Sequence, residues 1–119
     1  MRLLVIDAAN VVGSVPDGWW RDRPGAARRL VEQLDAAALG HDEVLVVLEG
    51  QARAAMPEGA ACGIRVVHAP ASGDDTIAAQ CAAAAASGHT VTLATADRGL
   101  IARVAGHGVT VVGPRTVRD

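Results

Sequence analysis

The sequence predicts an α/β protein: a three-layer α/β/α sandwich built on a parallel sheet of five strands in the order 3-2-1-4-5. Two observations predict this class. Five short apolar runs rich in Val, Leu and Ile show little polar alternation, which is typical of strands covered on both faces. Segments of helical character alternate with these runs, and such an alternation favours a parallel sheet with helices on both sides.

The predicted strands are the apolar runs themselves, and the first predicted helix lies between the first two runs. The runs cover residues 2–7 (RLLVID), 43–49 (EVLVVLE), 64–69 (IRVVHA), 90–96 (TVTLATA) and 109–113 (VTVVG). Residues 23–39 have apolar side chains at helical spacing and Pro24 near their start, so they predict a helix.

Two further helices are predicted in the second half of the chain. Residues 74–88 have an acidic first turn and a glycine stop at Gly88. Residues 97–108 form a shorter helical segment that ends in glycines. The crossover over residues 50–63 contains Pro57 and glycines, and we expect one short helix or an irregular link there.

Composition limits the class of protein. With 119 residues, half of them hydrophobic, the chain is long enough to form a core, so we expect one domain over residues 1–119. The formal charge of −2 means that any binding to nucleic acid must be local. All 11 basic residues are Arg, and the absence of Lys excludes Schiff-base chemistry, a phosphate-binding loop and a receiver domain.

The sequence also bears on location and on thiol chemistry. The N-terminal apolar stretch, residues 3–6, is too short for a signal peptide or a membrane span, so we expect a cytoplasmic protein without a membrane segment. Cys62 and Cys81 both have small, apolar neighbours in the sequence. We expect both to be buried free thiols.

Acidic residues gather where the predicted strands end. Asp7 ends the first strand, Glu49 ends the second, Asp97 follows the fourth, and Asp74 and Asp75 begin the helix after the third. In a parallel sheet these positions meet at one edge, where ligands bind. Each Asp alone is more simply a helix cap, but several at one edge repel one another, and a divalent cation relieves the repulsion. Oxygen ligands without nearby His or Cys favour Mg²⁺ or Mn²⁺.

Three motifs follow one another on these elements: VIDAANVVG, SGDDTIAA and TADRGL. Together they resemble the PIN-like nuclease superfamily, and within it the NYN domains of the YacP-like group, over residues 2 to 112. The resemblance implies a Rossmann-like sheet and a metal-dependent ribonuclease, in which a water activated by Mg²⁺ or Mn²⁺ hydrolyses an RNA phosphodiester. We expect an endoribonuclease, and exonucleolytic cleavage stays open. Whether one metal or two take part stays open.

The resemblance also implies roles for single residues. Asp7, Asp75 and Asp97 are implied to bind the metal, and Asp74 is a second candidate beside Asp75. Asn10 is implied to orient the site or the substrate. These residues form the candidate catalytic site.

The chain departs from the family pattern in two places. DAAN replaces the usual DGYN, and the fourth acid after Asp97 is missing, so the participation of Glu49 stays open. A second hypothesis is therefore a PIN-like module that binds RNA or protein without cleaving. A small-molecule phosphohydrolase is a third, disfavoured because DAAN lacks the second Asp of D-x-D. A homodimer or an antitoxin-like protein partner also stays open.

The segment over residues 15–29 follows the first strand and therefore arches over the same edge. It holds the only two aromatic residues, Trp19 and Trp20. Arginines accompany them or follow the fourth strand: Arg21, Arg23 and Arg98. Trp faces stack on unpaired bases and Arg contacts phosphate, so we expect binding of single-stranded RNA. We expect Trp19 to be exposed, whereas for Trp20 stacking and core packing are equally supported. Arg98 contacts phosphate or pairs with an acid.

Overall fold

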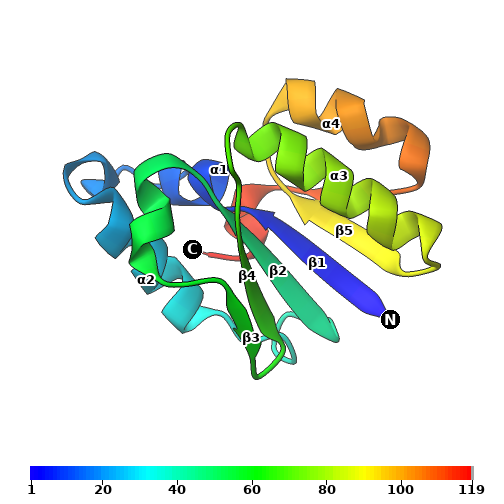
Figure 1. Ribbon diagram of the computed structural model, residues 1–119, viewed down its shortest axis with the longest axis horizontal. Coiled ribbons are helices and arrows are strands. Elements are labelled where there is room, and N and C mark those ends of the chain that lie inside the picture. Colours follow the sequence, from blue (N-terminus) through cyan, green and yellow to red (C-terminus); the bar gives the residue numbers. More distant parts are fainter. Residues whose placement is uncertain (119) are drawn as a thin grey trace.

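The computed structural model describes residues 1–118 and contains one six-stranded sheet (Figure 1). Residue 119, the last of the predicted domain, lies outside the described residues. The strand order is β3-β4-β2-β1-β5-β6. The strands are β1 (Arg2–Asp7), β2 (Glu43–Leu48), β3 (Gly59–Ala61), β4 (Ile64–His68), β5 (Thr90–Ala94) and β6 (Thr110–Val112).

The sheet has six strands rather than five, so its order differs from the predicted 3-2-1-4-5. The strands predicted from apolar runs are β4, β2, β1, β5 and β6, and neighbours among them pair in parallel. β3 is additional and pairs antiparallel with β4 at the edge of the sheet. Its sequence, GAA, does not predict a strand because its small residues are all exposed and form no apolar pattern.

A tight turn joins β3 to β4. Cys62 has a φ of 53° and Gly63 a φ of 79°, and positive φ at both central residues is typical of two-residue hairpin turns. Cys62 is exposed in this turn, so the prediction that both cysteines are buried is wrong for Cys62. Cys81 is buried, and burial raises the pKa of its thiol to about 11.

The helices are short and connect the strands. They are α1 (Ala8–Gly13), α2 (Arg23–Gln33), α3 (Gly73–Ala86) and α4 (Arg98–Val104), with 3-10 helices η1 (Trp19–Arg21), η2 (Gly50–Ala55), η3 (Ala105–His107) and η4 (Pro114–Thr116). α2 is shorter than the predicted helix over 23–39, because the backbone of Leu34 is extended. The crossover over 50–63 contains η2 and then β3.

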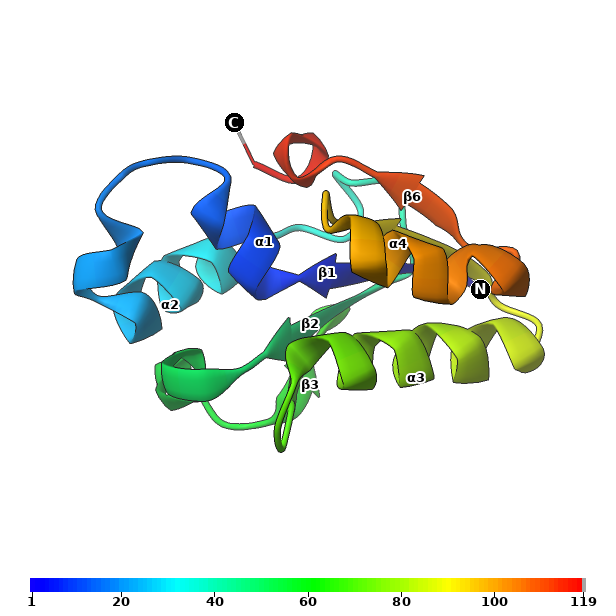
Figure 2. The same ribbon diagram turned by 90° about the horizontal axis from the view of Figure 1, so that it is seen from above.

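Helices cover both faces of the sheet. Successive residues of a strand point to opposite faces: Leu4 and Ile6 of β1 pack with apolar residues of α1 and α2, whereas Leu3 and Val5 pack with those of α3 and α4. Figures 1 and 2 both show α3 and α4 side by side. The chain therefore forms a helix layer on each side of the sheet, as predicted.

The topology determines where polar side chains gather. β1 lies between β2 and β5, and all three run parallel, so their C-terminal ends lie at one edge of the sheet. α1 begins directly after β1 at this edge (Figure 2). Within residues 1–118, no helix combines the length and the apolar character needed to cross a membrane.

Candidate functional site

Asp7 is the last residue of β1 and is only 4% exposed. One carboxylate oxygen accepts a hydrogen bond of 2.9 Å from the Thr95 hydroxyl, and the other accepts one of 3.4 Å from the backbone N of Asn10. Burial raises the pKa of Asp7 above its ordinary value of 3.8, and the hydrogen bonds oppose this rise. Asp7 therefore caps α1, but the same carboxylate is held in an environment that disfavours its charge.

Asn10 and Thr95 connect the end of β1 to the segment after β5. The side-chain oxygen of Asn10 accepts a hydrogen bond of 2.8 Å from the backbone N of Ala96. The hydroxyl of Thr95, which is 1% exposed, accepts one of 3.1 Å from the backbone N of Asp97. Sequence reasoning missed Thr95, although a hydroxyl at the end of an apolar strand run, two residues before Asp97, is a signal for such a contact.

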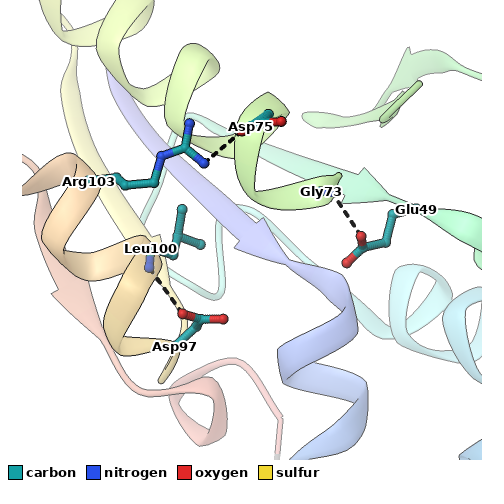
Figure 3. A network of polar contacts seen from close by, with 6 residues as sticks. All are labelled: Glu49, Gly73, Asp75, Asp97, Leu100 and Arg103. Carbon is teal, nitrogen blue, oxygen red and sulfur yellow. Dashed lines mark hydrogen bonds and ion pairs between the residues drawn. The ribbon is translucent and has the colours of Figure 1, made fainter. Parts of the chain in front are cut away.

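Asp97 follows β5 and caps α4. Its Oδ1 accepts a hydrogen bond of 3.0 Å from the backbone N of Leu100 (Figure 3). The capping alternative weighed from the sequence therefore applies to Asp97, and the cap uses one of its two carboxylate oxygens. No hydrogen bond from a side chain within residues 1–118 reaches the second oxygen, Oδ2.

The two adjacent acids at the start of α3 have different surroundings. Burial raises the pKa of Asp74, and the charges of Asp97 and Glu49 raise it further. Asp75 instead forms an ion pair of 2.8 Å with Arg103 of α4, and its side chain is 70% exposed (Figure 3). The charges of acids that end the strands thus act on Asp74, although the charge of Arg103 opposes their effect, whereas Asp75 is paired directly with Arg103.

Glu49 follows β2 directly and lies near the start of α3. Its Oε2 accepts a hydrogen bond of 2.8 Å from the backbone N of Gly73, the first residue of α3 (Figure 3). A Cβ on Gly73 would lie 2.7 Å from the Glu49 carboxyl carbon, so a larger residue there would displace the Glu49 carboxylate from this position. The charge of Glu49 also raises the pKa of Asp7 and of Asp74. Glu49 therefore belongs to the same electrostatic group as these two acids.

We call Asp7, Glu49, Asp74 and Asp97 the acidic edge. Within residues 1–118, no three His, Cys, Asp or Glu side chains are placed so that together they could hold one metal ion. The donor chemistry nevertheless fits Mg²⁺ or Mn²⁺, because every side-chain donor of the acidic edge is oxygen, and Mg²⁺ commonly binds one or two carboxylates while keeping several waters. Mutual repulsion of these carboxylates is the second observation that fits a cation.

The two tryptophans lie in η1, and the structure reverses the expectation for Trp19. Trp19 is half-buried and packs against the core, whereas Trp20 is 51% exposed. Their rings make an edge-to-face contact with centroids 5.7 Å apart. The guanidinium of Arg23 lies 5.3 Å from the centroid of the Trp19 ring. Trp19 was mispredicted because sequence spacing in a loop does not indicate which of two adjacent rings faces the core.

The remaining predicted arginines are on the surface. Arg21 and Arg98 are both exposed. Arg98 begins α4 next to Asp97, and in the described part of the chain it takes no part in an ion pair. Arg98 is therefore available to a ligand at the acidic edge, but no ion pair among residues 1–118 orients it.

A pocket of about 340 Å³ lies beside the acidic edge. Its lining includes Ala8 and Ala9 of α1, Trp19 with Arg23, and Glu49 with residues of η2. Glu49 therefore belongs both to the acidic edge and to the wall of the pocket.

Comparison with known proteins identifies the fold. No family model and no curated protein sequence matches the chain. Two solved structures of Rae1 (YacP) from Bacillus subtilis are similar to it. A point mutant superposes with a TM-score of 0.76 at 18% identity, covering 98% of this chain and 72% of that chain. A second Rae1 structure gives a TM-score of 0.70 at 16% identity, covering 98% and 71%. The chain therefore has the fold of Rae1 (YacP), the group whose motifs its sequence resembles.

Proposed function

We propose that the protein is a metal-dependent ribonuclease whose site is the acidic edge. One observation carries the proposal: four carboxylates from four separate segments share one end of the sheet. Burial raises the pKa of Asp7 and of Asp74, and the charges of neighbouring acids raise both further. Asp7, Glu49 and Asp97 each accept a hydrogen bond from the start of a helix, but these contacts do not explain why the acids gather at one edge, where each adds repulsion to the others. The fold of Rae1 (YacP) and the three sequence motifs support the same function.

The proposed ligands of Mg²⁺ or Mn²⁺ are carboxylates of the acidic edge. Asp7, Asp74 and Asp97 are the proposed metal-binding carboxylates, with Glu49 as the fourth acid. Asp74 is preferred to Asp75 because Arg103 already pairs with Asp75. When bound, the cation would supply an activated water and neutralise charge on the phosphate.

The polar residues around the acids position them and the substrate. Thr95 fixes one oxygen of Asp7, and Asn10 fixes the loop that carries Asp97 through its bond to Ala96. The exposed guanidinium of Arg98 is the proposed contact for a substrate phosphate. Arg21 and the exposed ring of Trp20 extend the proposed surface for single-stranded RNA.

A second candidate function is a module that binds RNA without cleaving it. It is favoured by one observation, that no three of the described acids converge on a common point. The two functions differ in whether a cation is bound at the acidic edge, so one experiment separates them.

The experiment is cleavage of end-labelled single-stranded RNA by the purified protein with Mn²⁺, Mg²⁺ or EDTA. Asp97→Asn is the test variant, because asparagine keeps the cap on α4 while removing the charge. Asp35→Asn is the matched control, since Asp35 caps the N–H of Ala38 in a turn and contributes nothing to the acidic edge. Cleavage that needs metal and is lost only in Asp97→Asn supports the ribonuclease. RNA binding without cleavage, and without bound metal, supports the second candidate.

A further inference from the structure

The pocket beside the acidic edge has mostly small, apolar walls. Its volume of about 340 Å³ is within the range of pockets that take small ligands. Its apolar lining comes from three helical segments and one loop: Ala8, Ala9, Val12, Ala27, Ala52 and Ala71. The lining alanines leave space that larger side chains would fill, so the small side chains at these positions create the pocket.

One wall of the pocket is aromatic and planar. Trp19 lines the pocket, and the guanidinium of Arg23 lies 5.3 Å from the centroid of its ring. Indole and guanidinium groups both present flat faces that stack on heterocyclic rings. Trp19 also packs against the core, so the ring is positioned before a ligand arrives.

The polar groups of the pocket argue for an uncharged ring with hydrogen-bonding edges. Gln51 lines it and has both donors and acceptors, as a nucleobase edge requires. Among the described lining residues Arg23 is the single cation, and the Glu49 carboxylate offsets its charge. A free phosphate ester is therefore a poor occupant, because no uncompensated positive charge of the pocket would balance its negative charge.

The pocket and the acidic edge are close enough to bind parts of one nucleotide chain. Glu49, one of the four acids of the acidic edge, lines the pocket, and Ala8 of the pocket follows Asp7 directly. In RNA only a ribose separates each base from its phosphate. A strand whose phosphate lies at the acidic edge therefore has a neighbouring base within reach of the pocket.

We infer that the pocket binds one nucleobase of single-stranded RNA, next to the phosphate held at the acidic edge, by stacking on Trp19 and by hydrogen bonds to Gln51. The inference rests on the proposed function and adds a base-binding subsite to it. The pocket sets the position of the strand, while the acidic edge acts on the phosphate.

The test compares two RNA probes of equal charge. A labelled eight-nucleotide RNA and its fully abasic counterpart are titrated with Asp97→Asn protein, which leaves the RNA intact, and binding is followed by fluorescence anisotropy. Ala9→Leu fills the pocket from an exposed position of α1. Ala79→Leu is the matched control, because Ala79 is exposed on α3 and does not line the pocket. Ala52→Leu fills the pocket from η2 and replaces Ala9→Leu should that variant fail to fold.

The expected result is a loss of about tenfold in affinity for the intact RNA in the filled variants, the size of one lost stacking contact, with no change for the abasic probe or in Ala79→Leu. If the variants with a filled pocket bind intact RNA as tightly as the protein with an open pocket, the proposed subsite is wrong. Cleavage of RNA by the wild-type protein would in that case still support the ribonuclease. An equal loss for both probes would also overturn it, since the pocket would then act on the backbone. Absence of both RNA binding and cleavage would overturn the subsite and the proposed function together.

Discussion

The hydroxyl of Thr95 donates a hydrogen bond of 2.9 Å to the buried carboxylate of Asp7, joining the end of β1 to the residue that follows its neighbour β5. The same hydroxyl oxygen accepts the backbone N–H of Asp97. One buried side chain thus connects two acids of the acidic edge. This connection makes Thr95 a positioning residue for the site.

Thr95→Val is expected to lower the free energy of unfolding by about 1–3 kcal/mol at pH 7, because it keeps the shape but leaves the buried Asp7 carboxylate without that donor. Urea denaturation measures the change. Thr95→Ser, which retains the hydroxyl, is the control and should recover most of the loss. A valine variant as stable as wild type would show that the hydrogen bond does not stabilise the fold.

Asp7→Asn is expected to increase stability at pH 7 when EDTA is present. The pKa of the Asp7 carboxyl is raised in the folded protein, so the folded protein binds the carboxyl proton more tightly than the unfolded chain does. Part of the stability of the fold is therefore lost as the pH rises through the raised pKa. The variant has no such ionisation. Its advantage should therefore shrink as pH falls toward 3.8, the ordinary pKa of Asp. Urea denaturation across this pH range tests the sign, and a variant less stable than wild type at pH 7 would refute it.

Gly73→Ala is expected to destabilise the protein by about 0.5–1.5 kcal/mol, because the new Cβ would lie 2.7 Å from the carboxyl carbon of Glu49 and displace that side chain from its hydrogen bond to the backbone N of Gly73. Gly106→Ala is the control, since nothing lies within 4 Å of a Cβ built there. A double-mutant cycle with Glu49→Ala identifies the cause: the cost of Gly73→Ala should fall once the carboxylate is gone. An unchanged cost in the Glu49→Ala background would place the clash elsewhere.

Asp74→Asn and Asp75→Asn are expected to differ in RNA cleavage although they alter adjacent acids. Asp74→Asn removes a charge of the acidic edge and should reduce the cleavage rate at least about tenfold. Asp75→Asn removes only the exposed ion pair with Arg103, so its rate should stay near that of wild type. Initial rates with saturating Mn²⁺ measure both. A larger loss of cleavage rate in Asp75→Asn than in Asp74→Asn would instead assign the metal-binding role to Asp75.

Much of the fold could be predicted because its signals are local. The apolar runs correspond to the parallel strands, and the rule that parallel strands end at one edge brought Asp7 and Asp97 together. The edge strand β3 could not be predicted, since Gly59–Ala61 pairs through its backbone and contributes no buried apolar side chain.

Side-chain direction was the part of the site that sequence could not determine. The motif SGDDTIAA does not distinguish Asp74 from Asp75, but in a helix two successive residues point in directions about 100° apart. Which of them faces the other acids depends on how α3 packs on the sheet through its buried residues, and Asp75 lies where it pairs with Arg103. Trp19 and Trp20 differ for the same reason, because the core contacts only one of the two rings closely.

Binding of Mn²⁺ tests the central claim most directly. Mn²⁺ is titrated into wild type and Asp7→Asn, and the free ion is followed by electron paramagnetic resonance, with Mg²⁺ added at the end as a competitor. The acidic edge predicts that wild type binds Mn²⁺, that Mg²⁺ displaces it, and that Asp7→Asn loses most of the binding. Wild-type protein that leaves Mn²⁺ free, or equal binding by the two proteins, would contradict a cation site at the end of β1.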